Sequence, residues 1–197
     1  FEVLNGTGNY LGKAWDDRVG CAVVIEVMRR LATTPHPNQI VYAITTQEEI
    51  GLRGAHTAAD VIKPALGIAI EGGITGDVFP GRPEETQAVL GGGPVLFVYD
   101  SSALPNRKLS AFVKQTAAEQ QLPLQLDLVQ GYGDDSAEIQ KSNGGVPTVN
   151  LLVPARYTHA HNGIINRRDF DQMVDLVVTL LQKLDAPAVA AIRDFTP

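Results

Sequence analysis

The sequence predicts an α/β fold in which a largely parallel central sheet carries helices on both faces. Short apolar runs rich in β-branched residues alternate with stretches whose apolar residues recur at helical spacing. The connections between these stretches are short, and this alternation is typical of strand–helix–strand units. A chain of 197 residues is long enough for one good hydrophobic core, and neither an internal repeat nor a linker divides it.

The first half of the chain contains both kinds of element. Residues 17–32 place apolar side chains along one helical face, and Pro35 follows as a helix terminator. Residues 39–45, Gln-Ile-Val-Tyr-Ala-Ile-Thr, form an apolar, β-branched run that is typical of a buried strand. The expected elements are strands at 1–4, 39–45 and 66–70 and helices at 17–32 and 51–61.

The second half begins with a loop, because residues 74–86 are rich in glycine and proline. Residues 106–121 and 168–184 carry apolar side chains at helical spacing, and residues 124–129 alternate like a half-exposed strand. The expected elements are strands at 87–99, 124–129 and 148–153 and helices at 106–121, 135–142 and 168–184.

The composition excludes several classes of function. Lys and Arg total 16 and Asp and Glu total 22, so the net charge of −6 argues against nucleic-acid binding and a polybasic membrane anchor. The single cysteine, Cys21, excludes an intramolecular disulfide and a cysteine-based zinc site. The sequence shows neither a secretory leader nor an apolar run near the ~20 residues of a membrane helix, so we expect a cytoplasmic protein.

Acidic residues stand where the expected strands end or the next helix begins. These acids are Asp16, Asp17, Glu48, Glu49 and Glu71. Each could simply cap a helix or face solvent at a strand end. Because ligands of α/β sheets bind beyond the carboxyl ends of the strands, we expect these acids to gather at one edge. Neighbouring carboxylates repel each other unless a cation compensates, so a bound metal ion is the alternative to capping.

A histidine adds a nitrogen donor to this set. His159 and His161 follow the last expected strand and face opposite ways if extended, so at most one is expected to be a ligand. Nitrogen and carboxylate donors together suit Zn²⁺, with Mn²⁺ or Co²⁺ as substitutes. Glu48 and Glu49 also point to opposite sides, which favours one ligand and one general base over a glycosidase pair of carboxylates.

Taken together, these segments resemble the M42 family of metallo-aminopeptidases, relatives of glutamyl aminopeptidase and of the tetrahedral aminopeptidases, some of which carry endoglucanase names. The resemblance rests on the segments GKAWDDRVG at 12–20, QEEIGLRGA at 47–55, Glu71 with 76–77, Asp135, GVPT at 145–148 and RYTH at 156–159. It implies a zinc-dependent exopeptidase fold, with residues 1–197 as a single, partial metallopeptidase catalytic domain.

The resemblance also implies a centre with two divalent metal ions, with zinc as the first expectation. Asp16 would bridge the two ions. Glu49 and His159 would complete one of them. Glu71 would bind the other ion, at a position where many family members have Asp.

Further roles follow from the same resemblance. Glu48 would be the general base that takes a proton from water and later passes it to the leaving amine. Asp17 would orient the neighbouring ligands, and the peptide bond between Asp16 and Asp17 would be strained or cis. Asp135 and Arg156 are assigned to substrate binding. The implied reaction is removal of N-terminal residues from peptides.

The sequence departs from the family pattern in what it lacks. The family supplies a further His ligand from a segment ahead of the matched part and inserts a small β domain that is used for assembly. We therefore expect the N-terminal strands and that domain to be missing, and a homo-oligomer for the full-length protein. Two alternatives stay open, namely a related metal-dependent deacylase or carbohydrate-active hydrolase, and a non-catalytic fragment that lacks one metal-ligand His.

Overall fold

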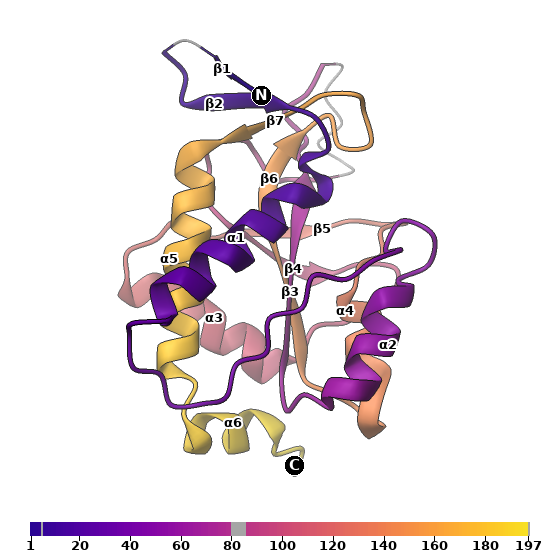
Figure 1. Cartoon of the computed structure of the whole chain (residues 1–197), viewed down its shortest axis with the longest axis vertical. Coiled ribbons are helices and arrows are strands. Elements are labelled where there is room, and N and C mark those ends of the chain that lie inside the picture. Colours follow the sequence, from indigo (N-terminus) through magenta and orange to yellow (C-terminus); the bar gives the residue numbers. More distant parts are fainter. Residues whose placement is uncertain (5, 80–85, 197) are drawn as a thin grey trace.

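The computed structural model describes residues 1–4, 6–79 and 86–196 and places them in one sheet with helices around it (Figure 1). The strands are β1 (Glu2–Leu4), β2 (Asn9–Gly12), β3 (Gly67–Ile74), β4 (Val95–Tyr99), β5 (Gln125–Leu128), β6 (Thr148–Arg156) and β7 (Gly163–Asn166). The helices are α1 (Trp15–Leu31), α2 (Arg53–Ile62), α3 (Arg107–Glu119), α4 (Ser136–Lys141), a 3₁₀ turn at Ser142–Gly144, α5 (Arg167–Lys183) and α6 (Ala186–Arg193). Within these described ranges, no helix is both long and apolar enough to cross a membrane.

The sheet is mixed, so the expectation of a largely parallel sheet is wrong. Its strands follow the order β1-β2-β7-β6-β4-β5, and β3 pairs with β6. The pairs β3–β6 and β4–β5 are parallel, whereas β1–β2, β2–β7, β6–β7 and β4–β6 are antiparallel. In β1–β2 and β6–β7 a short connection reverses the chain, whereas a parallel pair needs a crossover of about a dozen residues or more. The pairs β2–β7 and β4–β6 join strands far apart in the sequence, whose relative direction no local pattern fixes.

Helices cover both faces of this sheet, as the sequence predicts. Ile68 of β3 packs into the main core together with residues of α1, α3 and α5, and Leu151 of β6 is fully buried there. The preceding residue of β3, Gly67, lies instead against Ile139 of α4. Because successive strand residues point to opposite faces, α1, α3 and α5 lie on one face, and α4 with its neighbour α2 lies on the other.

Residues 39–45 do not form the strand that their pattern predicts. In the part of the chain that the structure describes, no backbone hydrogen bond joins this segment to a strand. Val41 and Ile44 are 53% and 56% exposed, although the pattern indicates burial. The segment runs past β3 without pairing with it (Figure 1). A strand requires a hydrogen-bonded neighbour, and these residues have none among the described strands.

Other differences between expected and observed elements are smaller. The strand expected at 87–99 is only β4, because the Asp169 carboxylate accepts the N–H groups of Gly91 and Gly93 and holds that stretch in a turn. The sequence pattern does not predict the short strands β2 and β7 or the helix α6. The expected loop at 74–86 falls partly on residues 80–85, which lie outside the described ranges.

Candidate metal centre

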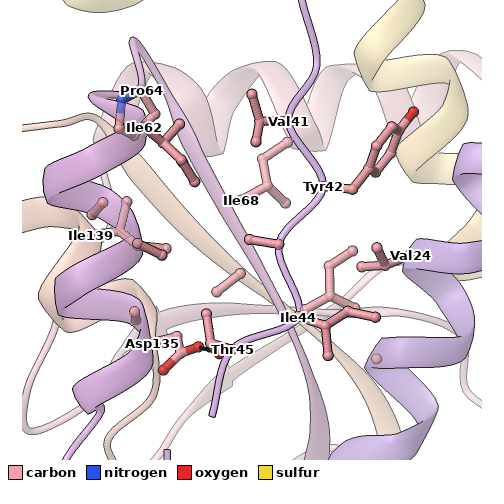
Figure 2. A pocket seen from close by; sticks show the side chains of 18 of the residues that line it. Val24, Val41, Tyr42, Ile44, Thr45, Ile62, Pro64, Ile68, Asp135 and Ile139 are labelled. Atoms are coloured by element: carbon pink, nitrogen blue, oxygen red, sulfur yellow. Dashed lines mark hydrogen bonds between the residues drawn. The ribbon is translucent and has the colours of Figure 1, made fainter.

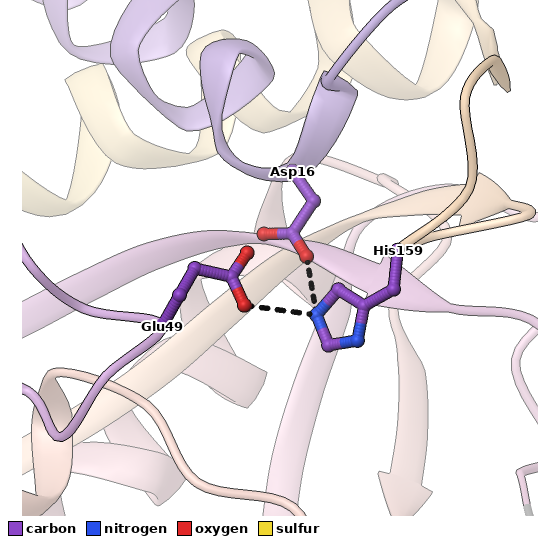
Figure 3. A group of neighbouring side chains, drawn as sticks. All are labelled: Asp16, Glu49 and His159. Atoms are coloured by element: carbon purple, nitrogen blue, oxygen red, sulfur yellow. Dashed lines mark ion pairs between the residues drawn. The ribbon is translucent and has the colours of Figure 1, made fainter.

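Three side chains from distant parts of the sequence meet at one edge of the sheet (Figure 3). Asp16 lies in the first turn of α1, Glu49 in the turn before α2, and His159 between β6 and β7. The Nε2 atom of His159 lies 3.0 Å from the Asp16 carboxylate and 3.4 Å from the Glu49 carboxylate. One candidate ligand atom of each residue lies within 4.8 Å of the other two. We call these three residues the donor group, since their side chains point toward one another and can surround a cation.

Close packing of α1 against β3 positions the acids at the start of α1. The Gly20 N–H donates a hydrogen bond of 2.8 Å to the Asp17 carboxylate. A Cβ atom on Gly20 would lie 2.2 Å from that carboxylate and 2.5 Å from the Ile70 carbonyl oxygen, so only glycine fits there. The peptide bond between Asp16 and Asp17 is cis, one of the two forms that the family resemblance implies. Burial, and to a lesser degree the Asp16 charge, raises the pKa of Asp17 to about 7.

A tight turn gives the two neighbouring glutamates different environments. The N–H groups of Gly51 and Leu52 donate to the Glu48 carbonyl at 3.0 and 2.9 Å. This turn leaves Glu49 exposed in the donor group, whereas Glu48 is half-buried; both glutamates line one cavity. Burial raises the pKa of Glu48 to about 7, and the Glu49 charge adds to the rise. A carboxyl group that titrates near neutral pH is suited to proton transfer.

Glu71 lies deeper in the molecule, on β3, and is only 6% exposed. Burial, followed by the charges of Asp17 and Asp134, raises its pKa well above the ordinary glutamate range. Asp134 is itself fully buried, and burial raises its pKa to about 7. Glu71 is not part of the donor group, although the Asp16 charge also contributes to its raised pKa. The site therefore continues inward as a series of buried acids.

The two residues assigned to substrate binding lie in different surroundings. Asp135 accepts a hydrogen bond from the Thr45 hydroxyl, and it lines the same cavity as Glu48 (Figure 2). Arg156, at the end of β6, forms an ion pair of 2.5 Å with Asp77. The structure thus places Asp135 in the same cavity wall as Glu48, the expected general base. The ion pair with Asp77 holds Arg156 against the segment that follows β3.

Two residues beside the site are not among those that the sequence pattern singles out. Tyr132 packs edge to face on Phe97, with ring centroids 4.9 Å apart, and burial followed by the Glu71 charge raises its pKa. Asp134 is the second. Both belong to the turn-rich run at 131–136, which the sequence allows as a plain helix cap. The available signal was a pair of adjacent acids before a helix, which repeats the pattern at the start of α1.

The donor group has the chemistry of a divalent metal site. Two carboxylates and one imidazole nitrogen are ligands that zinc accepts. Burial and then the Glu49 charge raise the pKa of Asp16, so a cation beside this carboxylate is electrostatically favourable. Near Glu48, whose pKa the charges of Asp135 and Asp134 also raise, one buried carboxylate oxygen of each of these two aspartates has no hydrogen-bond partner among the described residues. A bound cation would offset both the repulsion and the desolvation of these groups.

One curated relative matches nearly the whole of this chain. FrvX of Escherichia coli (strain K12) is 36% identical over 192 residues, which are 96% of this chain and 53% of FrvX. This chain therefore spans about half the length of FrvX.

Solved structures and a family model agree with that relationship. The TET aminopeptidase of a marine sediment archaeon (Thaumarchaeota) is 39% identical with a TM-score of 0.93, over 98% of this chain and 54% of that one. The Pyrococcus horikoshii TET1 peptidase is 29% identical with a TM-score of 0.83, over 93% and 53% of the two chains. The fold is thus the mixed α/β fold of these domains. The family model for M42 glutamyl aminopeptidase matches residues 1–176, and the chain belongs to the M42 peptidase family.

Proposed function

We propose that this protein is a metal-dependent aminopeptidase that hydrolyses N-terminal residues from peptides. The observation that carries the proposal is the donor group of Asp16, Glu49 and His159, which lies next to the half-buried Glu48. Membership of the M42 peptidase family supports the same activity, because the matching family model is described as glutamyl aminopeptidase.

Four side chains are proposed to hold two divalent metal ions. The donor group would hold one ion, and Asp16 and Glu71 would contribute to the second position. Zinc suits these oxygen and nitrogen donors, and cobalt or manganese are the substitutes. When bound, such ions supply positive charge that polarises a carbonyl group and favours deprotonation of water.

Glu48 is proposed as the general base of this site. Its carboxyl group is half-buried in the cavity wall, and its pKa of about 7 allows it to accept a proton from the attacking water near neutral pH. The same carboxyl group would then pass this proton to the leaving amine. Asp17 is proposed to position Asp16, because the carboxylate of Asp17 is itself held by the N–H of Gly20.

Substrate binding is proposed for Asp135 and Arg156. The Asp135 carboxylate lies in the same cavity wall as Glu48 and suits the ammonium group of a peptide N-terminus. The Arg156 guanidinium keeps a fixed direction through its ion pair with Asp77 and suits a carbonyl or carboxylate oxygen of the substrate.

The second metal position is incomplete within residues 1–197, since only Asp16 and Glu71 are assigned to it. We propose that a further histidine ligand, additional N-terminal strands and a small β domain come from a part of the protein outside these residues. This chain matches only 53% of FrvX, which supports the proposal. A homo-oligomer is also proposed, because the P. horikoshii TET1 peptidase can assemble into a tetrahedron or a large octahedral shell.

The test uses an extended protein, in which the part of the archaeal TET aminopeptidase outside the match is joined ahead of Phe1. We expect it to release p-nitroaniline from aminoacyl p-nitroanilides, a chelator to abolish this release, and Zn²⁺ or Co²⁺ to restore it. Glu48→Gln should lower kcat by about 10²–10⁴-fold without changing metal content. Glu119→Gln, on the exposed surface of α3, is the matched control. Release that survives chelation, or an unchanged kcat in Glu48→Gln, contradicts the proposal.

A further inference from the structure

A large cavity separates residues 38–45 from β3 (Figure 2). Its volume is about 850 Å³, and its two long walls are residues 38–45 and residues 66–71. Val24 of α1 closes it from one face of the sheet, and Ile139 of α4 closes it from the other. The cavity is therefore a groove between two stretches of backbone, with a helical layer on each side.

The backbone edges that face this groove lack partners. β3 pairs with β6 along its whole length, from Gly67 to Ile74, and so uses one of its two edges. Among the residues that the structure describes, no strand pairs with the other edge of β3, and residues 39–45 make no backbone–backbone hydrogen bond. Buried N–H and C=O groups are almost always paired in folded proteins. Two facing edges without partners therefore indicate that a neighbour is missing between them.

The groove has the length of one strand. At about 3.3 Å per residue, a six-residue wall such as 40–45 or 66–71 spans about 20 Å, which is the usual length of a strand in a globular protein. The β-branched pattern of residues 39–45 also predicts a strand that is buried on both faces. The same residues are partly exposed here, with Val41 at 53% and Ile44 at 56%.

The walls of the groove define the chemistry of its occupant. Val24, Val177 and Leu181 line it from the face of α1 and α5, and Ala59 and Ile139 line it from the face of α2 and α4. The acids of the candidate site, Asp16, Asp17, Glu48, Glu49, Glu71 and Asp135, also line this cavity. Away from these acids, an occupant is in contact with apolar side chains on both faces. Strands in that position read as continuous runs of Val, Ile and Leu, without polar alternation.

A small ligand is the alternative occupant, because ligand pockets commonly measure about 300–1,000 Å³. The backbone edges decide against it. Regularly spaced N–H and C=O groups on two opposite walls are satisfied together only by a strand that pairs on both sides. The relatives also contain the material for such a strand, since this chain matches only 54% of the archaeal TET aminopeptidase.

We propose that this groove is the docking slot for one further β-strand of about six residues, apolar on both faces, from the part of the protein that corresponds to the unmatched half of its relatives. The strand pairs with β3 on one side and with residues 40–45 on the other. Its insertion turns residues 40–45 into the strand that their sequence predicts. It also continues the sheet beyond β3 and covers Val41 and Ile44.

Hydrogen exchange measured by mass spectrometry tests this proposal on the 197-residue chain and on the extended protein. In the chain alone, the amides of residues 40–45 should exchange fast. In the extended protein, they and the β3 amides that face away from β6 should exchange at least about tenfold more slowly. Slow exchange of residues 40–45 in the chain alone, or fast exchange in the extended protein, overturns the proposal. If the chain alone dimerises and its edges are protected, a second copy is the occupant and the proposal is also wrong.

Two isoleucine variants provide a matched comparison that does not depend on exchange rates. Ile44 lines the groove and is 56% exposed, whereas Ile50 is 60% exposed and lies outside the groove. Ile44→Lys should lower the Tm of the extended protein by several degrees and leave that of the chain alone nearly unchanged. Ile50→Lys should affect both proteins equally, and an equal effect of Ile44→Lys on both overturns the proposal. None of these measurements uses catalysis, so an inactive extended protein with a filled groove counts against the proposed function alone.

Discussion

Zinc should raise the melting temperature of the 197-residue chain by binding to the donor group. Its three residues place a candidate ligand atom each within 4.8 Å of one another. An ion that binds only the folded chain stabilises it by about 2.7 kcal/mol at a hundredfold excess over its Kd. For a domain of this size, each 1 kcal/mol corresponds to about 2–4 °C. The expected shift in Tm is therefore about 5–11 °C.

The size of this shift should depend on pH, because metal ions and protons compete for the same atoms. Burial, and then the Glu49 charge, raises the pKa of Asp16. In the fraction of molecules in which Asp16 is protonated, this carboxyl group has to lose its proton before it can bind zinc. The zinc-induced shift should therefore grow as the pH rises through the raised pKa of Asp16.

Differential scanning fluorimetry with ZnCl₂ or EDTA measures the shift, and single histidine variants locate it. His159→Ala should remove most of the shift, since it leaves only two carboxylates in the donor group. His161→Ala is the matched control, because this exposed histidine lies outside the donor group. His56→Ala controls for a second imidazole that lies 3.0 Å from the Glu138 carboxylate. A full shift in His159→Ala, or its loss in either control, would refute the reasoning.

Three other substitutions and one control test packing and electrostatics by urea unfolding. Leu151→Ala empties a fully buried position and should cost about 2–5 kcal/mol, while Val61→Ala at an 84% exposed position should stay within about 0.5 kcal/mol. Asp169→Ala removes the acceptor of two backbone N–H groups at 2.7 and 2.8 Å and should cost about 1–3 kcal/mol; an unchanged urea midpoint contradicts this. Burial raises the pKa of Glu71, so in EDTA the folded chain favours the protonated form. That contribution to stability is present below the ordinary glutamate pKa and is lost as the pH rises through the raised value. Glu71→Gln should flatten this decline, and an equally steep decline in the variant contradicts the assignment.

The helices were predictable because each carries its own local pattern. Apolar residues at helical spacing place α1 and α5 within two residues of their observed bounds. The pairing of strands depends instead on contacts between residues far apart in the sequence, so the antiparallel contacts of β6 with β4 and β7 were not predictable. Residues 39–45 illustrate the same limit: a local pattern describes the environment that a strand needs, and only the rest of the sheet can supply it.

The candidate site was partly predictable for a related reason. Its acids stand at strand ends and helix starts, and the topology of α/β sheets brings such positions together. The sequence could not show which of two adjacent glutamates faces inward, because the turn with positive φ at Gln47 and Leu52 decides it. Asp134 and Tyr132 were missed because only tertiary packing brings the buried Asp134 and the partly buried Tyr132 beside Glu71.

Helix capping accounts for Asp17 but not for the other acids of this site. A carboxylate that caps a helix accepts backbone N–H groups, and such bonds lower its pKa. Asp16 and Asp17 have non-helical backbone angles, and Asp17 accepts the N–H of Gly20, three residues further on, as an N-cap carboxylate does. Burial nevertheless raises the pKa of Asp17 to about 7. Glu48 and Glu71 also have raised pKa values, and burial is the first cause for each. A fold that buries carboxylates beside one another loses stability unless a cation joins them, which favours the proposed metal site over a purely local role for Glu48 and Glu71.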